Sequence, residues 1–483
     1  MDIQSLQPNP VWKYFAQLNA VPRPSKKEER VIAFMMDFGR SLGLETFKDR
    51  VGNVIIRKPA TKGMEDRKTV VLQSHLDMVH QKNNTTDFNF EEQGIEMYVD
   101  GDWVRARGTT LGADNGMGVA AIMAVLASEE IPHPPLEALF TIDEETGMTG
   151  AKGLESGLLQ GSILLNLDTE EDDEIDIGCA GGIDVTATGT YQQKRVPKGA
   201  RAYRLEVKGL QGGHSGMDIH RGLGNANKIM NRLLYAGSKV GDLFLIGIDG
   251  GGLRNAIPRE SNAYFALSNR EQDVLMAMKE LIGEIRKELA PTEPELQINI
   301  SEYENSGMMM GEEDRDKLLR AVYGVHNGVF AMSRAIDGLV ETSNNLARVE
   351  VQDGRIKIAC LTRSSVESAK MDLAGGLTSV FALAGYEVTL SGDYPGWTPD
   401  PDSEILKVLR AQYRLLFEEE PRVVSCHAGL ECGILGSHYP GMDMISFGPN
   451  IKGAHSPDER VQISSVQKFW TFLQKILLEI PGA

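Results

Sequence analysis

Seven residues that could bind metal ions or move protons occur in five short segments, near the ends of apolar runs. They are His75 and Asp77, Asp114, Glu144 and Glu145, Asp168, and His455. Imidazole and carboxylate ligands without thiolates suit zinc, cobalt or manganese. Two histidines with at least three carboxylates exceed the needs of one zinc ion that keeps a water position open, and they favour two metal ions bridged by a carboxylate. One glutamate of the adjacent pair then remains as a general base.

The elements around these residues predict how they could meet. β-Rich runs occur at 69–74, 136–142, 162–167 and 442–448, and helical patterns at 28–42 and 115–128. Apolar strands alternating with helices predict an α/β fold with a mostly parallel sheet. Most of the candidate residues would then follow the carboxyl ends of strands, where open α/β sheets form their sites.

Taken singly, each of these residues has an ordinary explanation. A lone histidine is usually structural, and Glu-Glu pairs are usually solvated. The acidic run from Glu170 to Glu174 is expected to be a solvated loop. Several strand ends that all carry metal-ligand chemistry are improbable by chance, so we interpret them together as one site.

The middle of the chain has a different style. Residues 189–200 are polar and suit a crossing linker. Strands and helices then alternate up to 302, and 315–391 repeats the theme, which suggests a duplicated unit. The α/β style returns near 393. We therefore expect an α/β catalytic domain formed by 1–185 and 393–483, interrupted by an inserted α+β domain at 186–392 that acts as a lid and dimerisation domain.

Composition narrows the class of protein. The chain has 483 residues with 50 Lys and Arg against 68 Asp and Glu, a formal net charge of −18. Such an acidic chain repels nucleic acid and anionic lipid, so neither is an expected partner. Four scattered cysteines predict no disulfide framework and favour a cytoplasmic protein. We see no signal peptide and no apolar run long enough to span a membrane.

The motifs resemble those of the co-catalytic zinc exopeptidases, the family that includes aminoacylase, glutamate carboxypeptidase and carnosinase. The matching segments are Ser74-His75-Leu76-Asp77, Gly112-Ala113-Asp114-Asn115-Gly116, Glu144-Glu145-Thr146-Gly147, Gly213-His214-Ser215-Gly216, Asn255-Ala256-Ile257-Pro258 and Gly453-Ala454-His455-Ser456. Longer matches, among them VGNVIIRKPA, RGTTLGADNG, YPGWTPD and HAGLECG, resemble the bacterial Xaa-His dipeptidase subgroup and span nearly the whole chain.

The resemblance implies a role for each residue. His75, Asp114 and Asp168 would hold one divalent metal, and Asp114, Glu145 and His455 a second. The expected metal is zinc, with cobalt or manganese possible. Glu144 would be the general base and Asp77 would orient His75. The peptide bond between Asp114 and Asn115 is expected to be cis.

The resemblance also implies a substrate and an assembly. Small peptides would be hydrolysed, with preference for dipeptides carrying a C-terminal histidine. His214 would stabilise the oxyanion, while Asn255 and Arg363 would hold the substrate carboxylate. His427, Glu431 and Cys432 would line the site, in roles that the sequence does not define. A homodimer through the inserted domain is expected, with His214 reaching the partner's site.

Other functions stay open or are disfavoured. An aminoacylase or a tripeptidase of the same family is the nearest alternative. A binding protein that has lost its metals is disfavoured because all five ligand positions and the base are present. A nucleophilic hydrolase is disfavoured because the sequence contains no Gly-x-Ser-x-Gly elbow.

Overall fold

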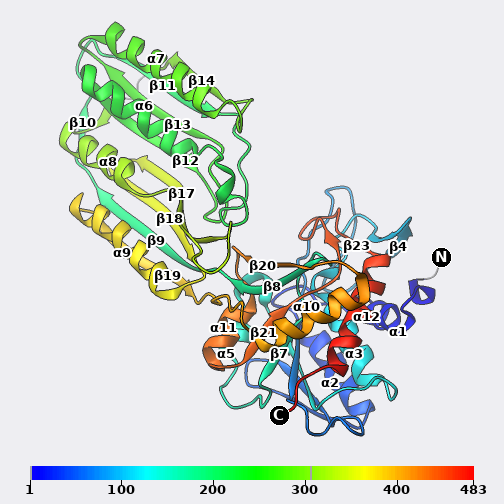
Figure 1. Cartoon of the computed structure of the whole chain (residues 1–483). Helices are drawn as coiled ribbons and strands as arrows, with labels where there is room; N and C mark the ends of the chain where they lie inside the picture. Colours follow the sequence, from blue (N-terminus) through cyan, green and yellow to red (C-terminus); the bar gives the residue numbers. More distant parts are fainter. Residues whose placement is uncertain (1–2, 305–306) are drawn as a thin grey trace. The chain divides into compact units, whose positions relative to one another are not determined.

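The computed structural model describes residues 3–304 and 307–483, which divide into two compact units. The first unit contains the chain up to Gly178, together with Trp397–Ser425 and Leu430–Ala483. The second contains Cys179–Gly396 and the short segment Cys426–Gly429. An α/β unit built from both ends of the chain is therefore interrupted by an α+β unit, as the sequence predicts (Figure 1).

An eight-stranded sheet forms the centre of the first unit. Its four central strands are mutually parallel and lie in the order β6 (Leu136–Thr141), β3 (Val70–His75), β7 (Ile163–Asn166) and β21 (Asp443–Ser446). The flanking strands are β1 (Glu45–Lys48), β2 (Val54–Lys58), β8 (Glu174–Cys179) and β20 (Arg422–Cys426). Every residue of β3, β6 and β7 is buried, which explains their nearly continuous apolar sequences.

Helices pack around this sheet. They are α1 (Asn9–Asn19), α2 (Glu29–Ser41), α3 (Ala113–Ala127), α4 (Glu144–Gly147), α5 (Thr149–Gly153), α10 (Glu404–Phe417), α11 (Glu431–His438) and α12 (Ile463–Leu478), with a short 3-10 turn at Ile3–Ser5. Helix α3 is buried on nearly every side because its sequence is almost entirely apolar, and it packs against β3 and α1. A four-stranded sheet at the side contains β22 (Ile451–Lys452), β23 (Arg460–Gln462), β5 (Trp103–Ala106) and β4 (Met97–Asp100).

The second unit is built from two copies of one βαββαβ pattern. The first copy comprises β11 (Arg201–Lys208), α6 (Ala226–Val240), β12 (Leu243–Gly251), β13 (Ser261–Leu267), α7 (Glu271–Leu289) and β14 (Gln297–Glu302). The other copy comprises β9 (Gly181–Thr190), α8 (Glu312–Gly324), β17 (Val340–Gln352), β18 (Arg355–Ser364), α9 (Glu367–Leu383) and β19 (Glu387–Tyr394). The first copy is inserted between β9 and α8 of the other.

The strand order demonstrates the duplication. The sheet runs β14-β11-β13-β12-β17-β18-β9-β19. Counted from its outer edge toward the middle of the sheet, each half has its fourth, first, third and second strands in that order. The two second strands, β12 and β17, join the halves by antiparallel pairing from Ile248 opposite Val351 to Gly251 opposite Arg348. The duplicated unit expected from 315–391 is therefore present, and its missing first strand is β9.

Smaller elements complete the second unit. They are β10 (Gln193–Arg195), β15 (Met308–Met310), β16 (Gly328–Met332) and a 3-10 turn at Ile219–Arg221. Residues 189–200, expected to be a linker, contain the end of β9 and β10 and lie within this unit.

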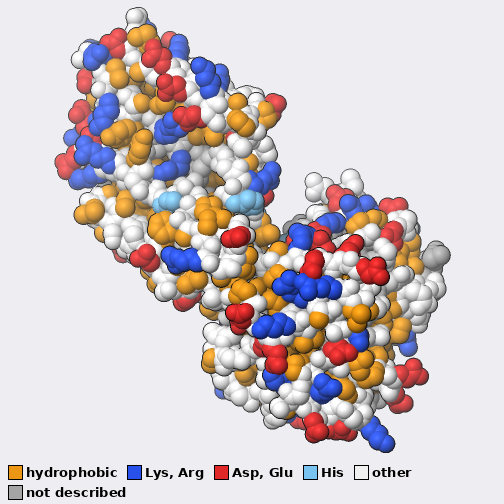
Figure 2. Space-filling view, in the orientation of Figure 1, with side chains coloured by type: hydrophobic (Ala, Val, Ile, Leu, Met, Phe, Trp, Pro, Cys, Tyr) orange, Lys and Arg blue, Asp and Glu red, His pale blue; other side chains and the backbone are white. Residues whose placement is uncertain are grey.

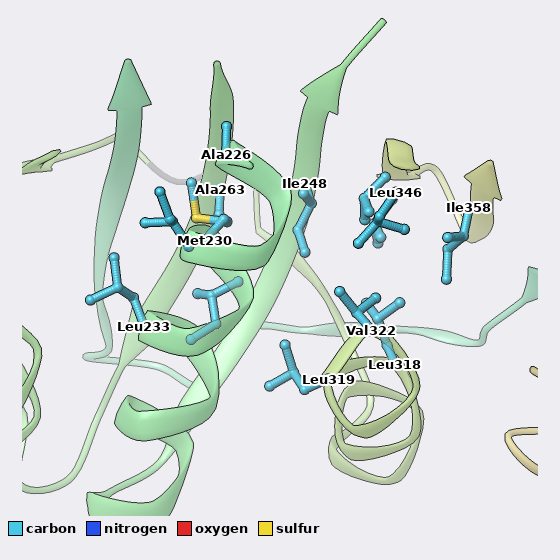
Figure 3. Close-up of a cluster of buried hydrophobic side chains, with 14 of the residues drawn as sticks. Ala226, Met230, Leu233, Ile248, Ala263, Leu318, Leu319, Val322, Leu346 and Ile358 are labelled. Carbon is cyan, nitrogen blue, oxygen red and sulfur yellow. The ribbon is translucent and has the colours of Figure 1, made fainter. Parts of the chain in front are cut away.

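One apolar core fills the space between the four helices and the sheet of the second unit. Figure 3 shows Met230 and Leu233 on α6 and Leu318 and Val322 on α8 packing toward strand residues such as Ile248. Helix α6 begins at Ala226 because the side chain of Asn225 accepts hydrogen bonds from the backbone N–H groups of Asn227 and Lys228 in its first turn.

On the face shown in Figure 2, acidic and basic side chains are interspersed over each unit. Among the described residues, no helix combines the length and apolar character needed to cross a bilayer.

Candidate metal centre

The first unit positions the candidate ligands at the ends of its central strands. His75 is the last residue of β3, and Asp168 follows β7 by two residues. Glu144 and Glu145 open α4, directly after β6. Asp114 is the second residue of α3, and the peptide bond after it is cis, as expected from the resemblance. His455 lies in the loop between β22 and β23.

The five proposed ligands come together in two sets that share Asp114. In the first set, Nε2 of His75 lies 3.2 Å from Oδ1 of Asp114 and 3.6 Å from Oδ1 of Asp168. In the second set, Nε2 of His455 lies 3.2 Å from Oδ2 of Asp114 and 3.0 Å from Oε2 of Glu145. The two oxygens of one carboxylate therefore face different histidines.

This donor set fits a pair of divalent metal ions. Ligand atoms of His75, Asp114 and Glu145 all lie within 4.8 Å of one another. The Oε1 atom of Glu145 is buried and has no hydrogen-bond partner among the described residues. A buried carboxylate oxygen without a partner is costly unless a cation or a donor meets it. Nitrogen and oxygen ligands with a central bridging carboxylate suit zinc, cobalt or manganese.

The electrostatics favour bound cations. Burial raises the pKa of Asp168 to about 8, and the neighbouring carboxylates Asp114, Glu431 and Glu145 contribute. Hydrogen bonds that His455 donates to the carboxylates of Asp114 and Glu145 raise the pKa of His455 to about 11. Burial opposes protonation of His75, yet Asp168 and Asp114 raise its pKa well above the usual range. Excess carboxylate charge draws positive charge into this site.

Asp77 connects three parts of the centre. Its Oδ1 atom lies 3.4 Å from Nδ1 of His75 and accepts the backbone N–H of Glu144 at 3.0 Å. Its Oδ2 atom accepts the hydroxyl of Ser25 at 2.8 Å and the backbone N–H of Glu145 at 3.3 Å. Asp77 therefore orients an imidazole and the turn carrying both glutamates, as a carboxylate behind a metal ligand does.

Glu144 lies among other acids. Burial raises the pKa of Glu144 well above the usual range, and Asp168 and Glu431 add to this effect. A carboxylate in such surroundings is a good proton acceptor.

A buried polar network lies in the strands that carry these residues. Oε2 of Glu431 accepts the Gln73 amide at 2.7 Å and the Thr141 hydroxyl at 2.6 Å. The amide of Asn166 donates to Oε1 of Gln73, and the hydroxyl of Ser446 donates to Oδ1 of Asn166. The other oxygen of Glu431, Oε1, has no partner among the described residues. Glu431 is thus anchored to β3 and β6 beside the ligands.

The acidic run after Asp168 is not the solvated loop that we expected. Glu170 is partly buried, and its backbone carbonyl accepts the N–H of Ile451. Burial, with Asp114 and Asp168, raises the pKa of Glu170 to about 8. The next residues form ion pairs: Glu171 with Lys452, Asp172 with Lys468 and Asp173 with Arg422. Pairing with cations from distant segments could not be anticipated from the acidic run alone.

The remaining predicted site residues lie in the second unit. The backbone N–H of Ser215, next to His214, donates to the carbonyl of Asn255 at 2.7 Å. Burial, with the charge of Arg363, lowers the pKa of His214 to about 4. Arg363 is buried and donates from Nη1 to the Tyr394 hydroxyl at 2.8 Å, while its Nε has no partner among the described residues. The second unit therefore gathers all three residues.

His427 belongs to this second group, although it lies in the C-terminal part of the chain. Its Nε2 is 2.8 Å from the Ser343 hydroxyl. Burial, with Arg363 and His214, lowers the pKa of His427 to about 3.

Two buried charged residues of the first unit were not identified from the sequence. Arg23 donates to Leu76, Asp77 and Gly112, and Glu459 accepts from residues 111–114. Glu459 lies four residues after His455, which could have drawn attention to it. The segment around Arg23 carries no comparable signal.

The chain is similar to known dipeptidases along its whole length. The chain is 46% identical over 482 residues to the cytosol non-specific dipeptidase of Escherichia coli (strain K12), covering 100% of this chain and 99% of the relative. It is similar to a crystal structure of aminoacylhistidine dipeptidase from Vibrio alginolyticus, with TM-score 0.94, 45% identity, and coverage of 100% and 99%.

A more distant structure shares the fold alone. It is aminopeptidase PepT from Bacillus cereus ATCC 10987, with TM-score 0.62, 17% identity, and coverage of 98% of this chain and 99% of PepT. The sequence profile of Peptidase family M20/M25/M40 matches residues 71–479. This match covers most of the chain, including every proposed metal ligand, and the protein therefore belongs to Peptidase family M20/M25/M40.

Proposed function

We propose that this peptidase hydrolyses unblocked dipeptides and prefers those with a C-terminal histidine, such as β-alanyl-histidine. Two divalent metal ions per subunit are required, with zinc as the first choice and cobalt or manganese as alternatives. The observation that carries the proposal is the division of the Asp114 carboxylate, whose oxygens lie 3.2 Å from His75 and 3.2 Å from His455. Such a carboxylate can serve two metal ions at once.

The ligands divide accordingly. His75, Asp114 and Asp168 would hold one ion, and Asp114, Glu145 and His455 the other. Bound divalent ions would supply Lewis acidity for hydrolysis by water. The carboxylate of Asp77 contacts both His75 and the backbone of Glu144 and Glu145, so it would fix the position of the imidazole relative to the two glutamates.

Glu144 is the proposed general base. It would take a proton from the attacking water and later give it to the leaving amine. Its raised pKa, caused by burial and by Asp168 and Glu431, supports the base role. Oε2 of Glu145 lies 3.0 Å from Nε2 of His455, so Glu145 is proposed as a metal ligand rather than as the base.

His214 is the proposed donor to the developing oxyanion. Its Nδ1 accepts backbone N–H groups from Gly216 at 3.2 Å and Met217 at 3.0 Å. A neutral imidazole that accepts at Nδ1 carries its proton on Nε2, which leaves that N–H to donate. The lowered pKa of His214 supports the neutral form near pH 7.

Asn255 and Arg363 are proposed to hold the substrate carboxylate. Nε of the Arg363 guanidinium has no hydrogen-bond partner among the described residues, and the planar donors of a guanidinium suit a carboxylate. Preference for a C-terminal histidine is supported by the similarity to aminoacylhistidine dipeptidase. The similarity to the cytosol non-specific dipeptidase instead favours a wider range of dipeptide substrates. An aminoacylase or tripeptidase remains the alternative within the family.

The test is a substrate panel with controlled metal content. Enzyme stripped by chelator should lose activity and regain it with zinc, cobalt or manganese. The panel should compare β-alanyl-histidine, alanyl-histidine, alanyl-leucine, alanyl-alanyl-histidine and an N-acetyl amino acid. Full activity in metal-free protein would overturn the metal centre. Preference for the tripeptide or the N-acetyl compound would select the alternative, and equal turnover of the dipeptides would overturn the histidine preference.

We also propose that the protein is a cytoplasmic homodimer that associates through the second unit. The cytosol relative and the lack of a disulfide pattern support the location. Exposed Leu383 and Leu390, on α9 and on edge strand β19, offer apolar surface for association. Light scattering measures the mass of the protein in solution. A monomeric mass for fully active protein would overturn the dimer.

A further inference from the structure

Arg23 is a fully buried arginine whose hydrogen bonds go mainly to backbone carbonyls. Its Nη1 donates to the carbonyls of Leu76 and Asp77, both at 3.1 Å. Its Nη2 donates to the carbonyl of Gly112 at 2.5 Å and to the side chain of Asn19 at 2.9 Å. The guanidinium therefore connects the loop after His75 with the loop before Asp114.

Glu459 binds the same loop from its backbone N–H side. Its Oε2 accepts the N–H groups of Leu111 at 2.6 Å and Gly112 at 2.9 Å. Its Oε1 accepts the N–H groups of Ala113 at 2.7 Å and Asp114 at 3.2 Å. One buried carboxylate thus receives four consecutive backbone donors. Because Glu459 follows His455 by four residues, it also ties the His455 loop to the Asp114 loop.

The packing around these groups leaves little freedom. A Cβ atom added at Gly112 would lie 2.5 Å from Nη2 of Arg23, and one added at Gly116 would lie 2.6 Å from the same atom. Gly112 also has a φ of +71°, which other residues rarely adopt. The backbone before Asp114 is therefore defined from several sides.

We propose that Arg23 and Glu459 are paired positioning residues that set the affinity of the metal centre. They do so by fixing the backbone that follows His75 at the end of β3, the backbone at the start of α3 around Asp114, and the loop that carries His455. Arg23 and Glu459 make these hydrogen bonds to backbone atoms and to Asn19, so both act on the proposed ligands through the main chain. Burying a guanidinium and a carboxylate is costly unless hydrogen bonds compensate for the lost hydration. Both Nη atoms of Arg23 and both carboxylate oxygens of Glu459 make such bonds, whereas Nε of Arg23 has no partner among the described residues. Most of these bonds go to backbone next to the proposed ligands, so they stabilise the conformation of the metal centre.

The proposal rests on the two-metal centre and predicts how metal binding changes. Glu459→Gln keeps the size of the side chain but turns one acceptor into a donor facing backbone N–H groups. Loss of such supporting contacts typically weakens metal binding by about 10–100-fold. Since Glu459 joins the Asp114 and His455 loops, the ion shared by Asp114, Glu145 and His455 should be lost first, and stoichiometry should fall from two toward one.

The experiment measures metal binding directly, without substrate. Full-length apo protein is titrated with zinc against a chromophoric chelator, and the cobalt form is examined by absorption spectroscopy. The matched control is Glu137→Gln. Glu137 is also a buried carboxylate that accepts two backbone N–H groups, from Gln160 and Gly161, but it lies near the start of β6, away from the ligands.

Expected results separate this inference from the proposed function. Glu459→Gln should lose at least tenfold in zinc affinity and change the cobalt spectrum, while Glu137→Gln keeps the wild-type affinity even if its melting temperature falls. Wild-type affinity in Glu459→Gln would overturn the positioning role. Should that variant fail to fold, Arg23→Lys decides by the same criterion. Wild-type protein that binds no zinc would instead overturn the metal centre itself.

Discussion

Oδ1 of Asp77 accepts the backbone N–H of Glu144 at 3.0 Å, and it also lies 3.4 Å from Nδ1 of His75. One carboxylate oxygen therefore serves a proposed metal ligand and the proposed base. Asp77 thereby links the proposed metal-binding and proton-transfer functions of the site, although His75 and Glu144 are far apart in the sequence.

We expect Asp77→Asn to weaken metal binding and activity together. The amide has one acceptor oxygen, so it cannot satisfy His75 and the N–H groups of Glu144 and Glu145 as the carboxylate does. Zinc affinity should fall by about 10–100-fold, the usual range for a partner behind a ligand. Chelator competition and steady-state kinetics measure the two effects. Asp102→Asn is the control, since Asp102 accepts hydrogen bonds from Ser464 in the same unit.

The adjacent glutamates should give opposite phenotypes. Glu144→Gln removes the base and should lower kcat by a factor of at least about 10²–10⁴, with metal content near normal. Glu145→Gln removes a ligand that lies 3.0 Å from His455, so metal occupancy should fall first. Metal analysis of both purified variants, with kcat measured at saturating zinc, separates these outcomes. Normal occupancy in Glu145→Gln with low occupancy in Glu144→Gln would reverse our division of the pair.

The ligands could be anticipated because their chemistry and positions agree. Strand ends such as His75 after β3 are recognisable from apolar runs, and parallel strands bring their carboxyl ends to one edge. The α/β sheet and its inserted unit followed from the same patterns. The duplication was only suggested, since its first strand, β9, is separated from α8 by the whole inserted copy.

Residues that act through the main chain were not predictable. Arg23 and Glu459 bind mostly backbone atoms, and such bonds depend on the fold rather than on residue spacing. Strand β12 is difficult to predict because its sequence, LFLIGIDGG, contains three glycines, which weaken a strand pattern. Cys426–Gly429 joins the second unit although the residues on both sides belong to the first, and local sequence contains no sign of that.

His427 should make the protein less stable in acid. The folded-state pKa of His427 is about 3, lowered by burial, Arg363 and His214, whereas an unfolded histidine titrates near 6.5. Below pH 6.5 the unfolded chain binds a proton that the folded chain does not, so stability is lost as the pH falls. The slope approaches about 1.4 kcal/mol per pH unit, or roughly 2 kcal/mol between pH 7.5 and 5.

The measurement is urea unfolding at these two pH values. His427→Gln can retain a hydrogen bond to Ser343 but has no titrating group, so its loss between pH 7.5 and 5 should be smaller than that of the wild type. His80→Gln, which changes an exposed histidine, should behave like the wild type. Equal acid sensitivity in His427→Gln and wild type would show that His427 is protonated in the folded protein.

His214 provides the last prediction, which tests both its chemistry and the chain in which it acts. His214→Ala should lower kcat by about 10²–10³, the usual cost of one oxyanion donor, while both metal ions are kept. If His214 serves the partner's site, inactive Glu144→Gln and inactive His214→Ala should complement each other. Random mixing would give half heterodimers, each with one intact site, and hence about a quarter of wild-type activity. Tagged subunits, co-purified to prove that heterodimers form, provide the measurement. Heterodimers that stay inactive would place His214 in the site of its own chain, and a nearly normal kcat in His214→Ala would remove it from the reaction.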